Sequence, residues 1–79
     1  MKPERYRNLS GDSGVSCYAT GPDFIAVQFQ DSTVYIYNYD RPGGVHVDRM
    51  KALAADGRGL GSYISRYVRK SFAWKQSSW

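Results

Sequence analysis

Apolar and polar residues alternate along the first half of the chain in the manner of β-strands. Ile25, Val27 and Phe29 share one side of an extended segment. Ala26 and Gln28 share the other side, and a period of two predicts a strand with one buried face. Neighbouring segments rich in β-branched and aromatic residues predict two more strands. The three predicted strands span residues 15–20, 24–30 and 33–39.

The links between the predicted strands are short and carry turn residues. Gly21-Pro22-Asp23 lies between the first and second strands, and Asp31-Ser32 interrupts the pattern between the second and third. Glycine, proline and aspartate favour tight turns. Three strands joined in this way predict an antiparallel meander.

The register of the second hairpin has two solutions. A two-residue loop places Val34 and Ile36 on the face that carries Val27. A three-residue loop places Tyr35 and Tyr37 there instead, because a slip of one residue exchanges the two faces of a strand. Tyrosine suits either side, since its ring is apolar and its hydroxyl forms hydrogen bonds. The residues alone leave both registers open.

Spacings of three and four residues replace the alternation in the second half of the chain. The apolar positions that fall near one face of a helix are Val47, Met50, Leu53 and Ala54. This pattern predicts a helix over residues 45–55.

A second helix is predicted after the glycines at positions 57 and 59, which end the first one. Ser62 has the residue type of an N-cap. Neither helix is long enough to be stable alone, so both are expected to pack against the sheet. The apolar stripe of the second helix consists of Tyr63, Ile64, Tyr67, Val68 and Phe72.

Together the elements follow the order β-β-β-α-α and predict an α+β fold. A three-stranded antiparallel meander is expected to be covered on one face by two C-terminal helices. The folded domain is expected over residues 13–72. Residues 1–12 are expected to form a polar N-terminal tail, and residues 73–79 an aromatic and polar C-terminal tail.

Length and composition narrow the class of protein. Seventy-nine residues suffice for one domain with a small core. No apolar run approaches the roughly 20 residues of a membrane span, and the first residues lack the apolar stretch of a secretory signal. Cys17 is the only cysteine, so no internal disulfide is expected. We therefore expect a cytoplasmic protein with no membrane partner.

The charge is divided unevenly along the chain. Residues 1–57 contain six basic and seven acidic side chains, a net charge of −1. Residues 58–79 contain five basic and no acidic side chains, a net charge of +5. This asymmetry favours an anionic partner such as a nucleic acid. An ordinary solvated helix face is the alternative explanation.

Most of these basic residues cluster on or beside the second predicted helix. Arg66, Arg69 and Lys70 are neighbours on a helical surface. Arg58 precedes the helix and Lys75 follows it. Such a cluster suits phosphate groups, and its affinity for a nucleic acid is expected to fall as salt is added.

Aromatic residues supply a second candidate surface. If Tyr35 and Tyr37 are exposed, they form a platform on which unstacked bases can lie. If they face the helices, they belong to the core and the platform is absent. Trp74 lies in a basic setting. It is either an anchor for a partner or a residue that folds back on the core.

The pattern that catalysis would need is missing from the sequence. His46 is the only histidine, and nothing near it or near Cys17 in the sequence would activate either side chain. The aspartates stand at predicted turns and helix ends, where they form local backbone hydrogen bonds. Metal-ligand spacing is missing as well. We expect a non-catalytic protein with no metal and no cofactor.

Several short motifs follow one another in a fixed order: Val27-Gln28-Phe29, Tyr35-Ile36-Tyr37, Pro42, the glycine-containing link 55–59, and Tyr63-Ile64. This order resembles the KTSC family, whose name refers to the C-terminal ends of some bacterial lysyl-tRNA synthetases. The resemblance covers about residues 13–72. Ser32 stands where the family usually has a glycine, and Gly57 stands where it usually has a serine.

This resemblance implies a hairpin register and a kind of partner. The family's Tyr-x-Tyr beside Val-x-Phe implies the three-residue loop, with Tyr35 and Tyr37 facing the helices. The attachment of the family domain to a synthetase implies RNA binding.

We therefore predict a small binding module that engages RNA, or another nucleic acid, through a basic C-terminal helix. The alternative is a protein-interaction module, such as a phage-encoded inhibitor or regulator that docks on an acidic surface of a bacterial nucleic-acid-handling or defence complex. Either module is expected to be a monomer or a weak homodimer, with no small-molecule substrate. The residues expected to bind are Arg58, Arg66, Arg69, Lys70, Lys75, Tyr35, Tyr37 and Trp74.

Overall fold

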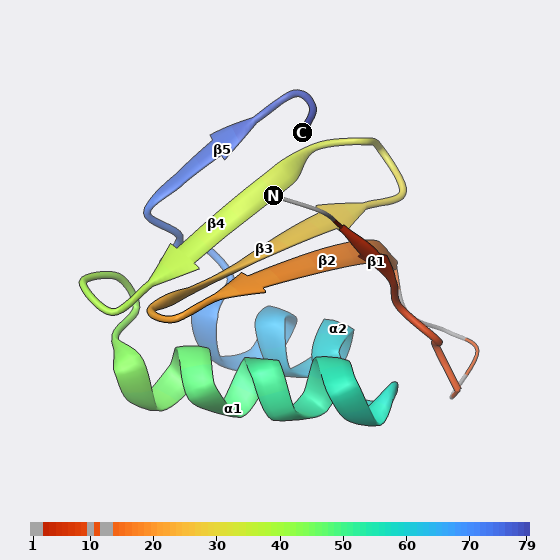
Figure 1. The fold of residues 1–79 in the computed structure, drawn as a ribbon, viewed down its shortest axis with the longest axis horizontal. Coiled ribbons are helices and arrows are strands. Elements are labelled where there is room, and N and C mark those ends of the chain that lie inside the picture. Colours follow the sequence, from red (N-terminus) through yellow and green to blue (C-terminus); the bar gives the residue numbers. More distant parts are fainter. Residues whose placement is uncertain (1–2, 10, 12–13) are drawn as a thin grey trace.

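The computed structural model describes residues 3–9, 11 and 14–79. Within them, five strands form one antiparallel sheet in which each strand pairs with the next along the chain (Figure 1). The strands are β1 (Glu4–Arg5), β2 (Val15–Gly21), β3 (Phe24–Phe29), β4 (Val34–Asn38) and β5 (Trp74–Gln76). The helices are α1 (Gly44–Asp56), α2 (Leu60–Tyr63) and the π-helical turn η1 (Ile64–Val68).

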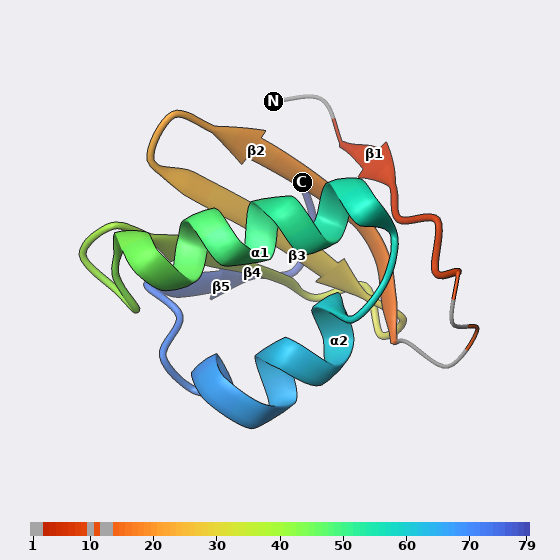
Figure 2. The same ribbon diagram turned by 90° about the horizontal axis from the view of Figure 1, so that it is seen from below.

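The molecule has two layers, and all its helical segments lie on one face of the sheet. Figure 2 shows α1 crossing that face, with α2 and the turn that follows it alongside. The predicted α+β class and the three central antiparallel strands are confirmed. None of the helices in the described part of the chain is long and apolar enough to cross a membrane.

Two strands lie in segments that the sequence analysis assigned to tails. Glu4 pairs with Tyr18, so β1 extends one edge of the meander. Trp74 pairs with Ile36, so β5 extends the other. Both new strands use backbone groups that a bare three-stranded meander would leave unpaired at its edges. Within the described residues the sheet therefore has five strands, two more than the predicted meander. The predicted domain boundary after residue 12 lies outside the described residues.

The hairpin between β3 and β4 has the three-residue loop. The backbone N–H of Phe29 donates to the carbonyl oxygen of Thr33 at 3.1 Å, and Val27 pairs with Tyr35. Ser32 adopts a left-handed conformation with φ of 73°, as the last residue of such a loop commonly does. Tyr35 and Tyr37 therefore face the helices, which settles the choice that the residues alone left open.

A β-bulge in β2 brings Val15 and Tyr18 to the same face of the sheet. Val15 pairs with Phe29, but Cys17 pairs with Gln28, so one extra residue sits in β2 between the two pairs. Without the bulge, Val15 and Tyr18 would point to opposite faces, because side chains alternate along a strand. With it, both pack against the helical layer.

The helix α1 buries the face that its spacing predicts. Val47, Met50 and Ala54 are buried against the sheet. The helix ends at Gly57, whose φ of 79° is left-handed and whose N–H bonds the carbonyl oxygens of the last turn. The N-terminal segment closes this end, since the N–H of Leu9 donates to the Gly57 carbonyl oxygen at 2.8 Å.

The second predicted helix differs from expectation in its start and in its geometry. It begins at Leu60 with Gly59 as N-cap, so Ser62 is not the cap. After one α-helical turn the chain widens into η1. The buried residues Leu60, Ile64 and Val68 lie four apart, and a straight α-helix would rotate them steadily off one face. A turn with i to i+5 hydrogen bonds holds more residues and keeps the three together.

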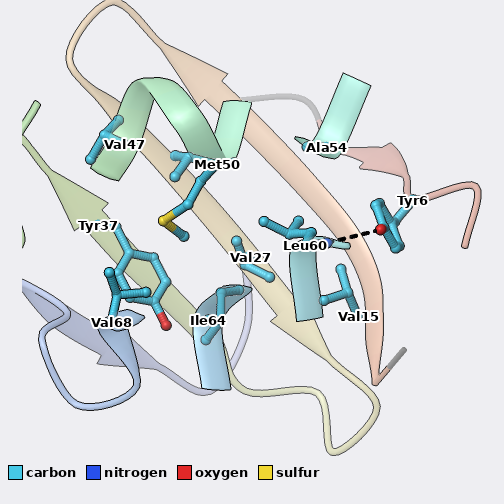
Figure 3. Close-up of a cluster of buried hydrophobic side chains, with 11 residues drawn as sticks. Tyr6, Val15, Val27, Tyr37, Val47, Met50, Ala54, Leu60, Ile64 and Val68 are labelled. Atoms are coloured by element: carbon cyan, nitrogen blue, oxygen red, sulfur yellow. Dashed lines mark hydrogen bonds between the residues drawn. The ribbon is translucent and has the colours of Figure 1, made fainter. Parts of the chain in front are cut away.

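The main core lies between the sheet and the helical layer (Figure 3). It includes Tyr6, which is 3% exposed and whose hydroxyl accepts the backbone N–H of Leu60 at 3.2 Å. The residue sits just after β1, so part of the expected N-terminal tail belongs to the core. The other buried members are Val15, Ile25, Val27, Tyr37, Val47, Met50, Ala54, Leu60, Ile64 and Val68.

The opposite face of the sheet carries a second, smaller cluster. Ala26, Val34 and Ile36 are buried there, with Phe24 packed against them. The indole N–H of Trp79 donates to the Gln28 side-chain oxygen at 3.1 Å, so the segment after β5 returns over this face. Both faces of the sheet are therefore partly covered.

Candidate functional site

A cavity of about 560 Å³ opens between the end of η1 and the edge of the sheet at β4 and β5. We call it the basic pocket. Aromatic side chains and basic side chains line it together. Its aromatic lining is Phe29, Tyr35, Tyr37 and Phe72, and its charged lining is Asp31, Arg69, Lys70 and Lys75.

Three rings form a continuous row along the pocket. Tyr35 meets Phe29 edge to face, with ring centroids 5.3 Å apart. It meets Phe72 in the same manner on its other side, at 5.0 Å. Edge-to-face pairs of this kind stabilise one another beyond the area that they bury. The row therefore holds Tyr35, which is half-buried, in a fixed position beside the opening.

The basic side chains reach the pocket from two separate segments. Arg69 and Lys70 follow η1 directly, and both are exposed. Lys75 lies on β5 opposite Tyr35, so the two side chains share a face of the sheet. Asp31, in the β3–β4 hairpin, is the one acidic side chain that the described residues contribute to the lining. Three cations facing one carboxylate leave the pocket with a net positive charge.

The chain reaches β5 through a short connection that fixes this arrangement. The N–H of Ser71 bonds the carbonyl oxygen of Val68 at 2.8 Å, which closes the turn after η1. The N–H of Ala73 then bonds the carbonyl oxygen of Ile36 at 2.7 Å and docks the chain on β4. Phe72, between these two contacts, is directed into the basic pocket. Backbone pairing thus fixes the two segments that carry the cations beside the aromatic row.

Tyr37 forms the deepest part of the lining. It is 0% exposed, and burial raises the pKa of its hydroxyl above the ordinary range, with a smaller contribution from Tyr35. It pairs with Ile25 in the centre of the sheet. Of the two alternatives for Tyr37, an open platform or a place in the core, the structure has the core. Tyr35 is half-buried and lines the pocket.

The structure divides the predicted binding residues into three groups, of which Trp74 is the last. Arg69, Lys70 and Lys75 line the basic pocket together with the two tyrosines. Arg58 and Arg66 are exposed but do not line it. The expected stripe of Arg66 with its neighbours assumed a regular α-helix, and the π-helical turn changes the angles between these positions.

Trp74 lies on the other face of the sheet, because it pairs with Ile36 while Lys75 pairs with Tyr35. Conversely, sequence reasoning missed Phe29 and Phe72 as pocket residues and Asp31 as their acidic neighbour. Phe72 had a signal, since it continues the four-residue spacing of Ile64 and Val68. Its place in the pocket depends on the pairing of β5 with β4, which the sequence pattern does not show.

The structure gives His46 and Cys17 separate surroundings. The ring nitrogen Nδ1 of His46 lies 2.7 Å from the hydroxyl of Tyr63, between α1 and α2. Cys17 pairs with Gln28 and so belongs to the face away from the helices. No group of three or more potential metal-ligating side chains occurs among the residues that the structure describes.

Comparison of the chain with models of known protein families, with curated proteins and with solved structures gave no match. The resemblance to the KTSC family therefore stays a prediction.

Proposed function

We propose that this protein is a non-catalytic module that binds single-stranded nucleic acid, with RNA favoured, at the basic pocket. The observation that carries the proposal is the placement of Arg69, Lys70 and Lys75 around the row formed by Tyr35 and Phe72. A group of cations and a set of aromatic rings are the two components that single-strand binding uses.

The cations would neutralise phosphates, and the aromatic row would contact a base. Arg69 offers a planar fork that can hold one phosphate in two places, whereas Lys70 and Lys75 act as mobile point charges. A base that leaves the stack can lie against the aromatic lining at Tyr35. Double-stranded nucleic acid would expose phosphates but no unstacked base. The proposal therefore favours a single strand or a loop over a duplex.

This proposal uses a different part of the basic region from the sequence-based prediction. That prediction places the binding surface on a helical stripe that includes Arg66, with Arg58 nearby. Those two side chains do not line the pocket. They provide a matched control, because replacing both with glutamate changes the net charge as much as replacing Arg69 and Lys70 with glutamate.

The test is a fluorescence anisotropy titration of labelled single-stranded, hairpin and duplex RNA. The Arg69→Glu/Lys70→Glu variant is expected to lose about tenfold to a hundredfold in affinity for the single strand. The Arg58→Glu/Arg66→Glu variant is expected to lose much less. Equal losses would mean that binding follows net charge and not the pocket. No binding by the unaltered protein would exclude the function.

The alternative is an acidic protein surface as the partner, since the same cations would serve it. A pull-down from nuclease-treated bacterial lysate separates the two cases. Recovery of a stoichiometric protein that survives the nuclease, and that Arg69→Glu/Lys70→Glu abolishes, would favour the protein partner. Nuclease-sensitive recovery favours nucleic acid. A cytoplasmic location belongs to this proposal in either case.

A further inference from the structure

A second cavity, of about 270 Å³, lies on the face of the sheet away from the helices. We call it the acidic pocket. Its lining is Asp23, Phe24, Ile36, Asn38, Trp74 and Gln76. It shares no lining residue with the basic pocket.

Strand register brings the apolar part of the acidic pocket together. Ile36 on β4 lies between Ala26 on β3 and Trp74 on β5, and it is buried. The neighbouring pair is Phe24 with Asn38, one step along the sheet. Ile36 can therefore serve as the floor, with one aromatic side chain from β3 and one from β5 as walls.

Local contacts hold both aromatic walls. The indole N–H of Trp74 donates to the side-chain oxygen of Gln76 at 3.4 Å, while the residue stays 52% exposed. The ring of Phe24 lies against Gly21, where an added Cβ would come within 1.9 Å of its Cε1 atom. Gly21 thus leaves the space that this ring occupies. Both rings are positioned without any ligand.

The charge of the acidic pocket is opposite to that of the basic pocket. Asp23, in the turn between β2 and β3, is the one acidic or basic side chain that the described residues contribute to its lining. Within the described part of the chain, no hydrogen bond or ion pair engages its carboxylate. The ammonium group of Lys51 approaches this turn, but it is bound to the carbonyl oxygens of Gly21 and Pro22, at 2.6 and 3.1 Å.

The two amides of the lining are already engaged by the protein. Gln76 accepts the Trp74 indole N–H and donates to the Ser78 carbonyl oxygen at 2.7 Å. The side-chain oxygen of Asn38 accepts two backbone N–H groups, from Asp40 at 3.1 Å and Arg41 at 2.8 Å. The groups left for a ligand are mainly a carboxylate and aromatic faces.

We propose that the acidic pocket binds an organic cation whose head is an alkylated ammonium group. The negative faces of Trp and Phe rings attract such a head, and Trp attracts it most strongly. The Asp23 carboxylate adds an unpaired negative charge at the rim. The methyl groups of the head fit the apolar floor at Ile36. The same head occurs on free choline-like molecules and on methylated lysine side chains.

The other classes of ligand fit this lining less well. A phosphate or carboxylate would meet Asp23 with no basic side chain in the lining to offset it. A nucleobase needs donors and acceptors along its edge, and most of the amide groups here are satisfied within the protein. A neutral hydrocarbon would gain contact with the rings but nothing from the carboxylate.

The test follows the indole N–H signals of Trp74 and Trp79 by NMR during titration. Three ligands are compared: choline, its neutral isostere 3,3-dimethylbutan-1-ol, and an acetylated trimethyl-lysine amide. Choline is expected to shift the Trp74 signal in a saturable manner, at least about tenfold more tightly than the isostere. Trp79 serves as the internal reference. Tighter binding of the lysine derivative would assign the site to a methylated side chain, and tighter binding of choline to a free molecule.

Variants distinguish the site from a general surface effect. Asp23→Asn is expected to remove most of the preference for the cation over the isostere, and Trp74→Ala to abolish saturable binding. Arg69→Glu/Lys70→Glu is expected to leave choline binding unchanged, so that this proposal and nucleic-acid binding can fail separately. Equal affinity for choline and the isostere would overturn the proposal. So would the absence of saturable binding by both choline and the trimethyl-lysine derivative.

Discussion

The hydroxyl of Tyr6 accepts a hydrogen bond from the backbone N–H of Leu60, at 3.2 Å. This contact joins the segment after β1 to the first residue of α2. The N–H groups at the start of a helix have no partner within the helix, and here a side chain from far along the sequence supplies one. The N-terminal segment thus supplies a hydrogen-bond acceptor to the helical layer.

Removal of the Tyr6 hydroxyl is expected to lower the free energy of unfolding. Tyr6→Phe keeps the ring but leaves the buried N–H of Leu60 without its acceptor, which costs about 1–3 kcal/mol. Urea denaturation followed by circular dichroism measures the change. Tyr67→Phe is the control, because Tyr67 is exposed and a change of this kind on the surface is nearly neutral. Equal effects of the two variants would contradict the role assigned to Tyr6.

Two glycines with the same backbone conformation are expected to respond differently to alanine. Gly57 and Gly59 have φ of 79° and 80°, so either substitution strains the backbone by about 1–2 kcal/mol. A Cβ on Gly57 would also lie 3.0 Å from Cβ of Arg7 and 3.3 Å from Cγ of Leu9. On Gly59 the nearest contact is an ordinary 3.7 Å, to Leu53.

Gly57→Ala is therefore expected to destabilise the protein more than Gly59→Ala in thermal unfolding. The difference between the two should shrink when Leu9 is also changed to alanine, because one of the crowded neighbours is then removed. Identical losses in the two single variants would show that the N-terminal segment does not press on the end of α1.

Alkaline pH is expected to unfold the protein partly through Tyr37. Burial raises the pKa of Tyr37 in the folded state, whereas an unfolded tyrosine ionises near pH 10. Above about pH 10 the unfolded chain has lost a proton that the folded chain keeps, so stability falls as pH rises. Below that pH the contribution is fully present.

Tyr37→Phe removes this dependence. The free energy of unfolding of the unaltered protein, relative to the variant, is expected to be constant from pH 7 to about pH 9. It should then fall by up to about 1.4 kcal/mol per pH unit above pH 10. Urea denaturation at a series of pH values tests this. A difference that stays constant to higher pH would contradict burial of the hydroxyl in its neutral form.

Nucleic-acid binding is expected to weaken with salt in proportion to the number of phosphates held. Three cations line the basic pocket. A single strand releases about 0.7 counterions per phosphate contact, so the slope of log affinity against log salt should be about −2. Lys75→Gln is expected to reduce the slope by about 0.7, and Arg58→Gln to leave it unchanged. A slope that both variants alter equally would place the phosphates elsewhere.

Much of the fold follows from local patterns in the sequence. The alternation at Ile25, Val27 and Phe29 identifies β3, and the three- and four-residue spacing from Val47 to Ala54 identifies α1. The resemblance around Tyr35 and Tyr37 implies a register in which these residues pair with Val27 and Ile25, and the strands have that register. For β3 and α1 the side chains nearest in sequence determine the element, whereas the hairpin register was implied only by the resemblance.

The parts that were missed depend on distant segments. β1 and β5 are two and three residues long, too short to show a period of two. They form because they meet an unpaired edge of the meander. The π-helical turn at η1 has a weak signal in the four-residue spacing of Leu60, Ile64 and Val68. Neither pocket could be predicted without β5.

The strand β5 separates the two cavities described above. Within three residues it sends Lys75 into one and Trp74 with Gln76 into the other. Because this one strand contributes to both linings, a change in its pairing with β4 would alter the two cavities together.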